Sequence, residues 1–210
     1  MDMTVQDLTA ILRRCADQVE SFAPQLNELD AKLGDGDLGA TLEKCAVKIR
    51  AALEQPVDTV DGVFKACGMA CARASGSIFG TLLGVAFLTC AKETAGHQSL
   101  SASDFPGLLK SVLDALIARG GAALGDKTVL DPLNAVRLSI TGQSDRAEQY
   151  RAALIAVDAT LHEYRSKPNR IGRALMYGER SIGMDDPGMI AFSYLLCATG
   201  GCNYNKPEMN

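Results

Sequence analysis

Apolar residues recur along most of this chain at spacings of three and four, which is the period of an amphipathic helix. The alternation of apolar and polar positions that marks strands does not recur. Short links separate eight helical stretches, so the pattern predicts an all-α, antiparallel, mostly up-and-down bundle. The stretches are Val5–Phe22, Leu42–Leu53, Val60–Cys71, the apolar run after Ser77, Leu108–Leu116, Asp131–Ile140, Leu154–Tyr164 and Pro187–Leu196.

Local signals mark several helix ends. Thr4 and Asp7 have the spacing of a capping box, and the glycine pair 120–121 is suited to close the fifth helix. Asp131-Pro132 and Asp186-Pro187 each have the form of an N-cap residue followed by a first-turn proline. These signals predict where the first, fifth, sixth and eighth helices begin or end.

The composition predicts a globular domain that works without nucleic acid. The 210 residues are 47% hydrophobic and carry a net charge of −4, with no basic block and few aromatic side chains. No repeat or linker divides the chain, so we expect one domain over residues 1–210, with roughly the last ten residues as a flexible tail. Seven cysteines lie in apolar helical patterns without zinc spacing, which favours reduced core thiols and a cytoplasmic location.

One segment raises the alternative of a membrane span. Ala74–Ala91 has no charged residue and is just long enough to cross a bilayer. However, it contains several glycine, serine and threonine residues, and no similar segment follows it. A helix buried on all sides within a bundle is the better interpretation, so we expect no membrane partner.

The acidic stretch Leu29–Gly39 is the most informative part of the chain. It holds Asp30, Asp35 and Asp37 within eight residues, among three glycines, which indicates a shaped loop. Clustered carboxylates repel one another, and oxygen ligands alone favour magnesium, manganese or calcium over zinc. A solvated acidic turn is the alternative, whereas an EF-hand fits poorly because the later ligand positions do not match.

Three further segments have features that favour anions. Ala74–Ser77 and Gly120–Thr128 are glycine-containing turns, and residues 167–185 form a long basic connection with little helix or strand pattern. The sequence of Gly120–Thr128 only superficially resembles a P-loop, because Asp126 interrupts the motif and no strand precedes it. Each segment taken alone could be a simple helix connection, but together with an acidic metal loop they describe a nucleotide phosphate site.

At this point the chain resembles a known family, the nucleotide-binding L subunits, or DAK2-type domains, of dihydroxyacetone kinases. Five motif blocks occur in the order that the family shows. They are Leu33–Gly39, Ala74–Gly76 with Phe79–Thr81, Gly125–Thr128, Gly172–Gly183 and Asp186–Gly188. The chain also has the expected length.

The resemblance implies an eight-helix barrel-like bundle with ADP or ATP bound at one end. It implies that Asp30, Asp35 and Asp37 are catalytic and hold two magnesium ions that bridge the nucleotide phosphates. It also assigns a set of further positions to the phosphates and the rest of the nucleotide. These are Leu38, Gly39, Ala40, Thr41, Ala74, Ser75, Gly76, Gly120, Thr128, Val129, Arg180, Asp186, Pro187 and Gly188.

The resemblance further implies a partner. A separate K-type subunit would hold a small ketose covalently on a histidine, and this chain would deliver the phosphoryl group to it. Either free ATP or a phosphocarrier protein would recharge the bound ADP. Leu38, Arg73 and Ser77 depart from the family's usual histidine, glycine and proline, which leaves the acceptor open, and a four-carbon ketose is one candidate.

Two alternatives belong to other functional classes. A non-catalytic nucleotide or metal sensor would bind nucleotide without transferring phosphate to a ketose. A stand-alone metal-dependent phosphatase would release phosphate without any partner.

Overall fold

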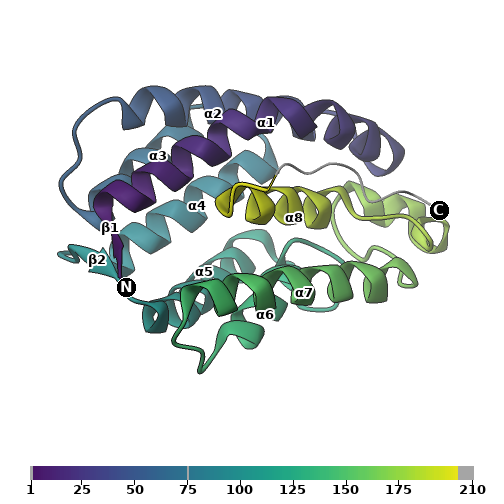
Figure 1. The fold of residues 1–210 in the computed structure, drawn as a ribbon. Coiled ribbons are helices and arrows are strands. Elements are labelled where there is room, and N and C mark those ends of the chain that lie inside the picture. Colours follow the sequence, from purple (N-terminus) through teal and green to yellow (C-terminus); the bar gives the residue numbers. More distant parts are fainter. Residues whose placement is uncertain (1, 75, 203–210) are drawn as a thin grey trace.

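The computed structural model describes residues 2–74 and 76–202. In this part of the chain, eight α-helices run alternately up and down (Figure 1). The helices are α1 (Val5–Leu33), α2 (Leu38–Leu53), α3 (Val60–Ala74), α4 (Ile78–Glu93), α5 (Phe105–Gly120), α6 (Leu130–Ile140), α7 (Arg146–Arg165) and α8 (Pro187–Thr199).

Four minor elements complete the fold. The 3-10 helices are η1 (Ala102–Asp104) and η2 (Arg173–Ser181), and the strands β1 (Met3–Thr4) and β2 (Ser99–Leu100) form a two-stranded antiparallel sheet. In that sheet Met3 lies opposite Leu100. This small sheet ties the start of α1 to the segment that follows α4.

The helices close into a ring. Each helix packs on its neighbours in sequence, and α8 also packs on α1. The all-α, up-and-down bundle predicted from the hydrophobic pattern is therefore confirmed, and so is the barrel-like form that the family resemblance implies. Because the helices alternate in direction, the α1–α2, α3–α4, α5–α6 and α7–α8 connections lie at one end of the ring, on the right in Figure 1.

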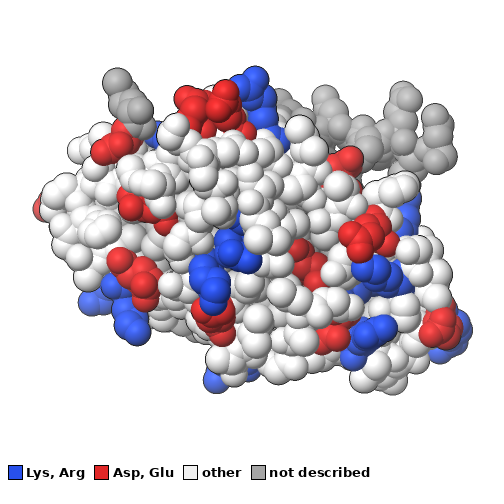
Figure 2. Space-filling view, turned by 90° about the horizontal axis from the view of Figure 1, so that it is seen from below, with Lys and Arg blue, Asp and Glu red and all other residues white. Residues whose placement is uncertain are grey.

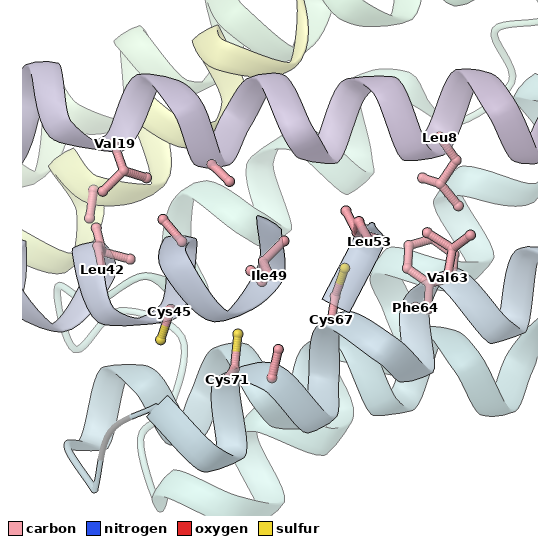
Figure 3. Close-up of a cluster of buried hydrophobic side chains, with 14 of the residues drawn as sticks. Leu8, Val19, Leu42, Cys45, Ile49, Leu53, Val63, Phe64, Cys67 and Cys71 are labelled. Atoms are coloured by element: carbon pink, nitrogen blue, oxygen red, sulfur yellow. The ribbon is translucent and has the colours of Figure 1, made fainter. Parts of the chain in front are cut away.

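The largest group of buried side chains joins α1, α2, α3 and α8. Figure 3 shows its α1–α3 part, where the sulfur atoms of Cys45 and Cys71 point toward one another across the α2–α3 interface. All seven cysteines are free thiols, and five of them are buried. Burial raises the pKa of the Cys67 thiol to about 12, so this core cysteine behaves as an apolar side chain.

Most of the expected helix ends are confirmed. Thr4 and Asp7 form a reciprocal capping box, and Asp186 caps α8 by accepting a hydrogen bond from the Met189 amide at 2.9 Å. Gly121 follows α5 with a φ of 68°, in the left-handed region that favours glycine. The expected flexible tail lies, from residue 203 on, outside the described residues.

Two expectations about loops are wrong. The acidic loop spans only residues 34–37, because α1 continues through Pro24 to Leu33 and α2 begins at Leu38. The segment 167–185, for which no regular structure was expected, contains η2. In both places packing against other helices overrides a weak local preference.

The exterior carries both signs of charge. Figure 2 shows lysine and arginine side chains interspersed with aspartate and glutamate on the face seen from below. Among the described residues, no helix has the length and apolar character needed to cross a bilayer.

Candidate metal and nucleotide site

Three carboxylates gather where α1 meets α2. Asp30 lies in the last turn of α1, and Asp35 and Asp37 lie in the short loop that follows. One ligand oxygen from each of the three lies within 4.8 Å of the others. The clustering predicted from the sequence is thus present, although Asp30 belongs to a helix rather than to the loop.

The backbone itself organises this cluster. One oxygen of Asp30, Oδ2, accepts hydrogen bonds from the amides of Asp37 at 2.9 Å and Leu38 at 3.3 Å. These bonds fold the loop back over the end of α1 and fix Asp30 in place. Asp35 is held differently, because its carboxylate forms an ion pair with Arg173 of η2.

The first turn of α2 packs tightly against α1. A side chain at Gly39 would collide with the backbone carbonyl of Ala23, so only glycine lets the two helices approach this closely. The amide of Ala40 donates to Asn27 Oδ1 at 3.1 Å, and the amide of Thr41 donates to the Asp37 carbonyl at 2.9 Å. Leu38 and Thr41 are buried and Ala40 is half-buried.

The α3–α4 connection supplies a second turn at the same end. Ala74 ends α3, and Gly76 is exposed with open space around its Cα. Ser77 caps α4 by accepting a hydrogen bond from the Gly80 amide at 3.1 Å. The expected phosphate-binding residue Ser75 lies outside the described residues.

The α5–α6 connection is held by a buried carboxylate. Asp131 was expected to cap α6, which is wrong, because the helix begins one residue earlier. Its carboxylate instead accepts hydrogen bonds from the amides of Gly125 at 2.7 Å and Thr128 at 2.8 Å. Asp131 thereby shapes the loop that carries Thr128 and Val129, both half-buried, while Gly120 is exposed at the end of α5.

Lys127 is buried at the centre of this end of the molecule. Its side chain is 1% exposed, and its backbone adopts a φ of 63°, which is uncommon for a residue with a side chain. The ammonium group donates hydrogen bonds to the backbone carbonyls of Lys167 at 2.8 Å and Ser181 at 3.1 Å. Burial lowers the pKa of Lys127, and the nearby carboxylates of Asp186 and Asp185 oppose that effect.

Asn169 links the same connection to the start of α8. Its side-chain amide donates to the Lys127 carbonyl at 3.1 Å and to Asp186 Oδ2 at 2.9 Å. Burial raises the pKa of Asp186 to about 6, although hydrogen bonds from Met189 and Asn169 act in the opposite direction. Arg180 is exposed, with its guanidinium over the Tyr177 ring at 5.6 Å from the centroid.

The α7–α8 connection touches two of the other three connections, and α8 beside it touches the start of α4. It reaches the α1–α2 loop through Arg173 and Asp35, and the α5–α6 loop through Lys127. Gly188 lies against Phe79 at the start of α4, where an added Cβ would come within 3.6 Å of the ring. The described residues expected at the site therefore lie on or beside four connections at one end of the ring.

The donor chemistry fits a hard divalent cation. Three carboxylates with converging oxygens and neighbouring backbone amides offer only oxygen ligands, and no histidine or cysteine belongs to the group. In the described part of the chain no other group of three acidic, histidine or cysteine side chains converges in this way.

The sequence interpretation missed three residues that organise this end. Asn27 lies one helical turn before Asp30 on α1, so a polar residue at that spacing could have been noticed. The roles of Lys127 and Asn169 had no local signal. The carbonyls that Lys127 contacts, and the Lys127 carbonyl that Asn169 contacts, are about 40 or more residues away in the chain. Only Asp186, the second partner of the Asn169 side chain, is nearer.

Comparisons with known proteins show which family the chain resembles. The model of the DAK2 domain family matches residues 32–200. The chain is 29% identical, over 93% of its length and 96% of the relative's, to the PEP-dependent dihydroxyacetone kinase, ADP-binding subunit DhaL, of Escherichia coli. It is also 30% identical to D-erythrulose kinase of Mycolicibacterium smegmatis, covering 87% of this chain but only 32% of that protein.

A solved structure shows the same fold. The native dihydroxyacetone kinase of C. freundii superimposes with a TM-score of 0.71 and 26% identity, over 90% of this chain and 33% of that longer chain. The family model, the relative of nearly equal length and the fold agree with one another. The chain therefore belongs to the DAK2 domain family.

Proposed function

We propose that this chain is the ADP- or ATP-binding subunit of a kinase for a short ketose. The observation that supports this best is the convergence of Asp30, Asp35 and Asp37 at the end of the ring where the four connections meet. The Escherichia coli relative of nearly equal length is named an ADP-binding subunit, which fits a chain that binds nucleotide and works with a partner.

Each segment at the cluster end of the ring has a distinct role in this proposal. The three carboxylates hold two magnesium ions, which when bound neutralise phosphate charge and align the phosphoryl donor with its acceptor. The first turn of α2 and the α3–α4 turn lie beside the phosphates. Thr128, Val129, Arg180 and the start of α8 enclose the rest of the nucleotide.

The acceptor and the source of phosphate belong to partners. A K-type subunit holds the ketose covalently on a histidine, and this chain delivers the phosphoryl group to it. The acceptor is dihydroxyacetone or a four-carbon ketose, since relatives of both kinds occur. Free ATP or a phosphocarrier protein recharges the nucleotide.

Calorimetry tests the binding half of this proposal. ADP should bind tightly in the presence of magnesium and much more weakly with EDTA, because three carboxylates and a diphosphate repel one another without cations. Asp37→Asn removes one anionic ligand and should weaken magnesium-dependent binding. Asp114→Asn is the matched control, since this exposed aspartate on α5 forms an ion pair with Lys110 and lies outside the cluster. Equal ADP affinity with and without magnesium would contradict the proposal.

A reconstituted assay separates the three classes of function. With a K-type subunit, ATP and a ketose, the kinase proposal predicts a phosphorylated ketose. Nucleotide binding without transfer would favour the sensor, and phosphate release without any partner would favour the phosphatase.

A further inference from the structure

The ion pair between Arg173 and Asp35 joins the α7–α8 connection to the acidic cluster. Arg173 is the first residue of η2, and Asp35 lies in the loop between α1 and α2. Both side chains are partly exposed, 60% for Arg173 and 43% for Asp35. The contact is therefore accessible to ions and ligands from solvent.

Two of the carboxylates are stabilised in different ways. Asp30 accepts two hydrogen bonds from backbone amides, which cannot leave without unfolding the loop. Asp35 is instead neutralised by a long, mobile side chain from another element. Within the cluster, Asp35 is thus a carboxylate whose counterion can be exchanged.

A divalent cation and the Arg173 guanidinium compete for this carboxylate. The ligand oxygens of the three aspartates lie within 4.8 Å of one another, so an ion that uses all three sits beside Asp35. Two positive groups beside one carboxylate repel each other, and solvent screens this repulsion only in part. Metal binding therefore weakens the ion pair, and the ion pair weakens metal binding.

The backbone around Arg173 permits such an exchange. Gly172 precedes it with a φ of 69°, in the region that favours glycine, and glycine has the widest range of accessible backbone conformations. The other end of η2 is fixed, because the Ser181 carbonyl accepts a hydrogen bond from the buried Lys127 ammonium. Arg173 can thus leave Asp35 while the far end of the segment stays in place.

We propose that Arg173 is an exchangeable counterion that makes metal binding depend on nucleotide. Without nucleotide, Arg173 neutralises Asp35 and disfavours a metal ion in the cluster. When nucleotide binds together with metal, the guanidinium leaves Asp35 and contacts phosphate oxygens instead. It can contact them through two parallel hydrogen bonds. This inference rests on the proposed function, and it adds a residue that couples the two ligands.

The test compares Arg173→Gln with Arg170→Gln. Both variants remove one positive charge from the same connection, and Arg170 is exposed. Calorimetry with Mn²⁺ on nucleotide-free protein measures metal affinity, and ADP is then titrated at saturating Mg²⁺. A half-exposed ion pair is worth up to ~1 kcal/mol, so Arg173→Gln should bind Mn²⁺ alone about two- to fivefold more tightly.

The same variant should bind ADP more weakly at saturating Mg²⁺, by a similar factor. Opposite changes for the two ligands are the signature, since simple damage to the site would weaken both. Arg170→Gln should change neither affinity by more than about twofold. Arg173→Lys keeps the positive charge, so its Mn²⁺ affinity should return to the lower value of the wild type. That result would exclude a purely structural effect of the Gln substitution.

The outcomes separate this inference from the proposed function. If Arg173→Gln binds Mn²⁺ no more tightly than Arg170→Gln while the wild type still binds ADP with magnesium, only the counterion role is overturned. If the wild type binds neither Mn²⁺ nor ADP with magnesium, the proposed function and the counterion role are both overturned.

Discussion

Replacing Lys127 with methionine tests whether its buried ammonium holds the site end together. Methionine has nearly the same volume and flexibility, so the change removes the donor and leaves little cavity. The carbonyls of Lys167 and Ser181 then lose the donor that they share. A buried acceptor left without a donor costs about 1–3 kcal/mol, and release of a desolvated charge offsets part of that cost.

We therefore expect Lys127→Met to lower the free energy of unfolding by about 2–4 kcal/mol. Urea unfolding followed by circular dichroism measures this change. Lys110→Met is the control, because this exposed lysine forms only an i,i+4 pair with Asp114, worth at most ~0.5 kcal/mol. Hydrogen exchange adds a local measurement, since the Arg170 amide, which donates to the Asp126 carbonyl, should lose protection. Equal stability of the two variants would refute the role assigned to Lys127.

Three further predictions concern single positions. Gly39→Ala should force α2 away from the Ala23 carbonyl, which lowers the free energy of unfolding by more than about 2 kcal/mol and abolishes magnesium-dependent ADP binding. Unfolding and calorimetry curves of this variant that match those of the wild type would contradict this. Asp186 has a folded pKa raised to about 6, so its contribution to stability is complete below about pH 4 and is lost as the pH rises through 6. In urea titrations between pH 4 and 7, the free energy of unfolding of the wild type should fall by about 1–3 kcal/mol relative to that of Asp186→Asn. Parallel pH curves for the two proteins would count against the shifted pKa. Thr4→Ala removes the α1 capping box and should lower the free energy of unfolding by about 1 kcal/mol. ADP affinity should stay unchanged, because the cap lies at the opposite end of the ring. A change in ADP affinity would show that the two ends are coupled.

The fold was predictable because local sequence determines most of it. The helical period locates the eight helices, and the capping residues Thr4 and Asp186 mark two of their starts correctly. The end of α1 was not predictable in this way. Pro24 and the glycines near Asp30 suggest an earlier end, but packing on α2 and α8 extends the helix to Leu33.

The candidate site was predictable where its residues are close in sequence. Asp30, Asp35 and Asp37 were identified because three acidic residues within one short stretch need an explanation. Asp131 has the local form of a helix cap, yet its carboxylate binds amides of the preceding loop. The buried state of Lys127 depends on carbonyls that only the folded ring brings to it, so no local pattern indicates it.

An even number of alternating helices places the start of α1 and the end of α8 away from the acidic cluster. Arg14 of α1 donates a hydrogen bond to the Ala198 carbonyl, so α8 ends level with Arg14. Asp30 lies sixteen residues further along α1, about 24 Å at 1.5 Å per residue. A domain fused after α8 that had to reach the cluster would need a linker of about seven or more extended residues running back along the ring.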